Sequence, residues 1–154
     1  MTMLAAIRPD AWNLPLFLHV LGAMVLVGAL VLAAGHLVPA WRATSTVALS
    51  HGFRSLLYAA LPALVVTRVT AQWLVSEQSL TDDPPAWVGI GFMTTDTGAL
   101  LLIVSLVVSG RAVSRARRSG AAPGTAVVRA ATVVVAILLA AFVATVWAMT
   151  AKPG

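Results

Sequence analysis

Long apolar segments alternate with short polar ones along the whole chain. Residues 14–38 contain no Asp, Glu, Lys or Arg. At about 1.5 Å of rise per residue, a helix over this segment is long enough to cross about 30 Å of hydrocarbon. Three further apolar segments follow at about 53–75, 88–109 and 127–149. The pattern predicts an all-α fold, an integral membrane four-helix bundle that forms a single transmembrane domain over residues 1–154.

Small residues and prolines add detail to the first two segments. Gly22, Ala29 and Ala33 share one side of the first predicted helix, so a second helix can approach its backbone closely there. Proline lacks the backbone N–H, and its ring crowds the carbonyl four residues earlier. We therefore expect Pro39 to end the first helix and Pro62 to kink the second.

Composition agrees with a membrane protein and excludes several classes of site. Hydrophobic residues make up 60% of the chain and charged residues 10%, whereas soluble domains carry about 25% charged residues. The chain has no cysteine, which excludes thiolate metal ligands, iron–sulfur clusters and c-type haem attachment. No glycine-rich nucleotide motif is present, and the loops are too short to hold an active site outside the membrane. We expect a protein that is not an enzyme.

Charge is distributed unevenly between the segments that connect the apolar stretches. The predicted loop 76–87 has acidic residues but no basic one, whereas the other two loops and the helix starts beside them are basic. The basic residues at this side are Arg42, Arg54, Arg111, Arg115, Arg117, Arg118 and Arg129. Basic loops stay in the cytoplasm. The pattern predicts a multi-pass plasma-membrane protein with both termini outside and 110–126 as a cytoplasmic loop. The net charge of +5 therefore reflects topology and not nucleic-acid binding.

Three predicted helices each carry one ionisable residue at a similar depth. On this topology His19, Arg68 and Asp96 lie about 8, 10 and 12 Å from the outer ends of their segments. An isolated charge in lipid is costly, and such groups usually face the bundle and pair. We expect Arg68 and Asp96 to neutralise each other, with His19 donating to Asp96 or accepting from Arg68.

The polar residues at this depth define one candidate site. It consists of His19, Arg68, Gln72, Thr94, Asp96 and Thr97. The first hypothesis is that this polar layer docks the helices and forms a small pocket open to the outer side. The alternatives are a purely structural ion pair that fixes how three helices meet and a functional polar site, namely a proton relay, ligand pocket or metal site that opens outward.

Two further hypotheses stay open. A haem- or copper-linked redox protein would use histidine ligands, and the candidates are His19, His36 and His51. His36 and His51 flank the first loop near the cytoplasmic side and are able to approach each other. The other hypothesis is an accessory subunit of a larger membrane complex, or a homo-oligomer. Under every hypothesis the lipid bilayer surrounds the chain.

The first apolar segment also carries a family resemblance. The stretch LHVLGAMVLVGALV at 18–31, with His19 near the outer start and Gly28 in a small-residue stripe, resembles the copper-resistance D-type family and related four-helix bacterial membrane proteins. The resemblance implies a bacterial plasma membrane and makes copper a candidate ligand.

Overall fold

A computed structural model describes residues 10–80, 85–120, 122 and 124–151. These residues are almost entirely helical and contain no strand, so the predicted all-α fold is confirmed. The helices are α1 (Asn13–Arg42), α2 (Thr46–Ser55), η3 (Leu56–Ala60), α3 (Leu61–Glu77), α4 (Ala86–Ser119) and α5 (Thr125–Ala151), and a short 3-10 turn, η2 (Asp10–Trp12), precedes α1. Because α2, η3 and α3 follow one another without a break, the described residues form four long rods, each long and apolar enough to span a membrane.

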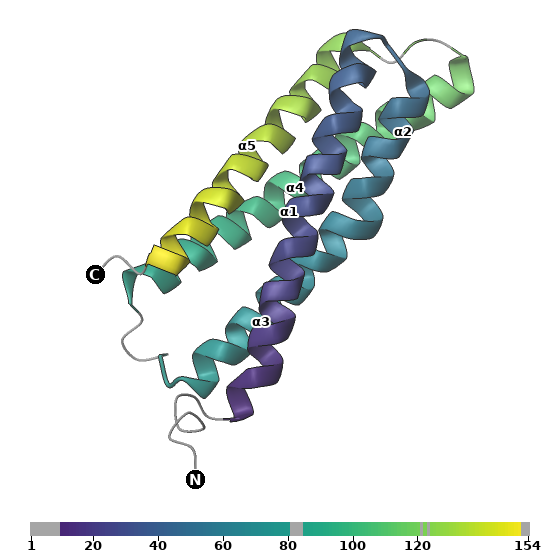
Figure 1. Ribbon diagram of the computed structural model, residues 1–154. Coiled ribbons are helices and arrows are strands. Elements are labelled where there is room, and N and C mark those ends of the chain that lie inside the picture. Colours follow the sequence, from purple (N-terminus) through teal and green to yellow (C-terminus); the bar gives the residue numbers. More distant parts are fainter. Residues whose placement is uncertain (1–9, 81–84, 121, 123, 152–154) are drawn as a thin grey trace.

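Helix α1 is the central element of the bundle. It packs against α3 along its first half and against α2 and α5 along its second half, while α4 packs mainly against α5 (Figure 1). The contact between α3 and α4 is much less extensive. Large apolar side chains point outward on all four rods, among them Phe17, Val69, Leu100 and Ile137. Such extensive exposed apolar surface fits a lipid environment.

Small residues set how closely the helices approach. Gly22, Ala29 and Ala33 are all buried on α1, as their shared side predicts. A Cβ added at Gly22 would lie 2.6 Å from Thr67 Oγ1 and 3.2 Å from the Thr67 backbone nitrogen, so only glycine allows α1 and α3 to meet there. A Cβ at Gly98 on α4 would lie 2.8 Å from the Phe142 ring of α5. A glycine thus allows close backbone approach between α1 and α3, and on α4 it makes room for an aromatic ring of α5.

The kink expected at Pro62 takes the form of a π-helical turn. Residues Leu56–Ala60 form this turn directly before α3, and the N–H of Leu61 bonds to the carbonyl of Leu56, five residues earlier. Pro62 cannot donate to the carbonyl of Tyr58, and its ring needs space beside that carbonyl. A wider turn supplies this space without ending the rod.

Two predicted helix ends are wrong. Helix α1 continues past Pro39 to Arg42, because the Pro39 carbonyl still accepts from Ala43 N–H at 2.8 Å and only one bond near the helix end is lost. The predicted loop 110–126 is helical over its first ten residues, since α4 runs to Ser119 and ends at Gly120, whose φ of 64° is the left-handed conformation that glycine favours.

The remaining predicted boundaries are closer to the structure. Each predicted span lies within one rod, and the rods extend beyond the spans at both ends. Helix α2 occupies most of the predicted first loop, and Ser45 caps it by accepting from the Ala48 N–H at 3.2 Å. In the acidic loop 76–87, Asp82 and Asp83 lie outside the described residues.

Candidate functional site

An ion pair joins α3 to α4 within the predicted apolar segments of both helices. Arg68 donates from Nε to Asp96 Oδ1 at 2.8 Å, and it is the only ion pair in the part of the chain that the structure describes. The two helices otherwise have little contact at this level. The pair is therefore a polar link between α3 and α4, whereas α5 provides the more extensive packing between α1 and α4.

Two further side chains hold the guanidinium in place. Arg68 donates from Nη1 to Gln72 Oε1 at 3.2 Å, and Gln72 lies one turn later on the same face of α3. The guanidinium carbon also lies 4.3 Å from the centre of the Phe92 ring on α4, a cation–π contact. Sequence reasoning missed Phe92, although its position four residues before Asp96 places both on one face of α4.

His19 has a different partner from those expected. Its Nδ1 donates to the main-chain carbonyl of Thr67 at 3.0 Å, and the described structure shows no hydrogen bond from His19 to Arg68 or Asp96. The Thr67 hydroxyl itself bonds to the carbonyl of Ala63 at 2.8 Å. His19 lies one turn before Gly22, where α1 and α3 approach most closely. This contact ties the histidine to the packing of α1 against α3.

The other residues of the predicted layer surround the pair without bonding to it. Thr94 is partly buried and Thr97 is exposed, and among the described residues neither donates to the Arg68–Asp96 pair. Thr95 between them is buried and bonds to the carbonyl of Gly91 at 2.7 Å. Hydrogen bonds therefore join Arg68, Gln72 and Asp96, and the other candidates are not part of this network in the described structure.

The ion pair lies at the surface of the isolated chain. The Arg68 side chain is 33% exposed and the Asp96 side chain 60% exposed. Gln72 beside them is also exposed. Two cavities that the structure describes lie elsewhere, at the opposite end of the bundle between α2 and α4. The polar layer is thus a polar strip on the outside of the bundle at the junction of α3 and α4.

The other two histidines meet as expected. The rings of His36 on α1 and His51 on α2 are 5.4 Å apart between centroids, in an edge-to-face arrangement. Within the described ranges no group of three or more His, Cys, Asp or Glu residues is placed to hold a metal ion. The pair accordingly offers two imidazole ligands. A structural zinc site needs four protein ligands and a catalytic zinc site needs three, so two histidines do not complete either kind of site.

Comparison with known proteins found no family model, no curated protein and no solved structure that matches this chain.

Proposed function

We propose that the chain is a small multi-pass plasma-membrane protein that is not an enzyme, in which the Arg68–Asp96 pair docks the α1–α3 side of the bundle onto α4. The observation that carries this proposal is the 2.8 Å ion pair between two helices that otherwise touch little. Charged groups within a span are rare and costly, and pairing across helices removes most of that cost. Gln72 and Phe92 add contacts that fix the orientation of the guanidinium.

Removing one member of the pair should destabilise the protein more than removing both. Arg68→Ala leaves the Asp96 carboxylate unpaired at a level where lipid surrounds the bundle. Asp96→Ala in addition should restore part of the lost stability, with a coupling free energy of about 0.5–3 kcal/mol. Thermal unfolding of the full-length protein in lipid nanodiscs measures this double-mutant cycle.

A second cycle with Arg54→Ala serves as the control, because Arg54 lies on the same rod but at its other end. Combined with Asp96→Ala, this change should give an additive loss. If the Arg68 cycle is also additive, the pair does not dock the helices.

The proposal includes the predicted topology, which places the ion pair in the outer leaflet. A membrane-impermeant maleimide should label Ser79→Cys, at the end of the molecule that carries the α3–α4 loop, in intact cells. It should label Ser114→Cys, exposed near the end of α4, only after permeabilisation. The chain has no native cysteine, so each label reports one position. Labelling of Ser114→Cys in intact cells would invert the topology.

A second candidate function follows from the exposure of the pair. A carboxylate that is 60% exposed has no water to solvate it in hydrocarbon. Contact with another polypeptide would cover Asp96, Gln72 and Thr97 together. This observation favours a subunit of a membrane complex or homo-oligomer, with the α3–α4 junction as the lateral contact. A haem- or copper-linked role stays a prediction that rests on the histidines and the resemblance.

Photo-crosslinking in native membranes tests the lateral contact. A benzophenone maleimide on Met93→Cys, 74% exposed and one turn from Asp96, should give adducts larger than the chain. Val146→Cys on α5 is the control, because Val146 is also exposed, at 45%, but lies on another helix. Its level in the bundle is similar, since Phe142 and Met149 on either side of it lie against Gly98 and Gly91 of α4. Equal adducts at both positions, or none at Met93→Cys, would contradict a contact at the α3–α4 junction.

A further inference from the structure

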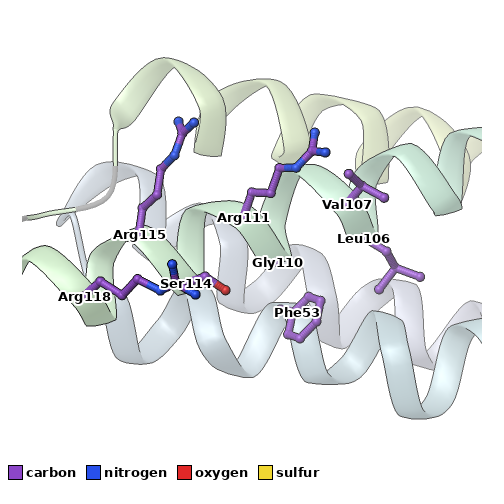
Figure 2. Close-up of a pocket in the computed structure, with 8 residues that line it drawn as sticks. All are labelled: Phe53, Leu106, Val107, Gly110, Arg111, Ser114, Arg115 and Arg118. Carbon is purple, nitrogen blue, oxygen red and sulfur yellow. The ribbon is translucent and has the colours of Figure 1, made fainter.

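A groove between α2 and α4 lies at the end of the bundle opposite the ion pair. Its main cavity has a volume of about 490 Å³, and Figure 2 shows the side chains that line it. Arg111, Arg115 and Arg118 line one part, and Leu106 and Val107 line the other. A neighbouring cavity of about 350 Å³ shares Phe53, Gly110 and Ser114 with the first.

The arginines share one face because α4 continues as a helix. Positions 111, 115 and 118 are four and three residues apart, which places their side chains in one row. Ala112, Val113 and Ala116 are buried on the opposite side and hold this part of α4 in the bundle. A loop over these residues would not align the guanidinium groups, so the row depends on the extension of α4 to Ser119.

Among the residues that the structure describes, no carboxylate forms an ion pair with these arginines. The sequence has no Asp or Glu between positions 11 and 76 or between 97 and 154. Asp96 is the nearest acidic residue along α4, about 22 Å from Arg111 at 1.5 Å per residue, and it is paired with Arg68. The second cavity adds Arg54 and Arg117 to the same groove. Five arginines therefore line the groove, and none of them has a carboxylate partner among the described residues.

The groove changes from apolar to basic along the helix axis. Leu106 and Val107 lie on the membrane side, and Arg118 lies about 18 Å further along α4. Gly110 separates the two parts, and a Cβ there would lie 3.1 Å from the Phe53 ring, so this glycine lets the ring form the wall of the groove. The polarity gradient has the direction of a phospholipid in a leaflet, with acyl chain inward and headgroup outward.

We propose that the α2–α4 groove binds an anionic phospholipid, with the phosphate on Arg111, Arg115 and Arg118 and an acyl chain along Leu106, Val107 and Phe53. Arginine presents a planar fork that suits phosphate oxygens. Basic pockets between membrane helices on the cytoplasmic side are suited to anionic headgroups. The apolar half of the groove favours a lipid over free phosphate, which would use the arginines alone. The site is independent of the polar layer at the other end.

Lipid-dependent stabilisation of the purified full-length protein tests the proposal. Thermal unfolding in detergent is followed during titration with phosphatidylglycerol, phosphatidylcholine or inorganic phosphate. Phosphatidylglycerol should raise the unfolding temperature in a saturable way, while phosphatidylcholine and inorganic phosphate should not. Arg111→Gln combined with Arg115→Gln should weaken the apparent affinity for phosphatidylglycerol roughly 10- to 30-fold.

The matched control removes two arginines of the same end that lie outside the groove. Arg42→Gln combined with Arg129→Gln lowers the net charge equally and should keep the affinity. An equal loss in both double variants would show diffuse attraction and overturn the site. Stabilisation by inorganic phosphate equal to that by phosphatidylglycerol would show a phosphate site without lipid. The absence of stabilisation by phosphatidylglycerol would also overturn the proposal.

Val107→Trp provides a test that leaves the charge unchanged. Val107 is exposed on α4, so a larger side chain there fills the groove without entering the core. The variant should keep its unfolding temperature without lipid and lose most of the shift with phosphatidylglycerol. A full shift would show that the apolar half of the groove takes no part in binding.

Discussion

An ionised side chain in hydrocarbon needs a partner, and on the proposed topology this constraint favours the ion pair between α3 and α4. Arg68 and Asp96 come from helices with few other mutual contacts, yet they approach to 2.8 Å. Removing one of two paired charges leaves the other without compensation, which is costlier than losing both. We therefore propose that the pair fixes the relative position of α3 and α4 even where it adds little net stability. Because the pair faces outward, the same constraint also favours a lateral partner.

The rest of the bundle depends on α1, and its packing divides the molecule into two chemically different ends. Near the predicted outer side, Gly22 brings α1 against α3, and His19 bonds across that interface to the Thr67 carbonyl. At the other end α1 packs against α2 and α5, and α2 meets α4 beside the arginine row. The acidic residues that the structure describes, Asp10, Glu77 and Asp96, lie toward the first end. This separation of charge leaves the arginines of the α2–α4 groove without protein counterions.

Hydropathy was sufficient to predict four helices, and depth along each helix was sufficient to align Arg68 with Asp96. Depth does not tell which way a side chain points. His19 faces Thr67 because Gly22, one turn later, allows α3 to pack against that side of α1. The extension of α4 was missed because Gly110 and the arginines resemble a loop. The signal was present in Ala112, Val113 and Ala116, which continue the helical period up to the cap at Gly120. The groove needs two helices at a defined distance, which no single segment encodes.

The central claim is that opposite charges at positions 68 and 96 hold α3 on α4 within the bilayer. Exchanging the two charges tests it most directly. Arg68→Asp and Asp96→Arg, made separately, each place two like charges at one level, and the yield of monodisperse protein extracted from membranes should fall sharply. The two changes together restore opposite charges and should recover much of that yield. A combined variant that is no better than either single one would contradict the claim.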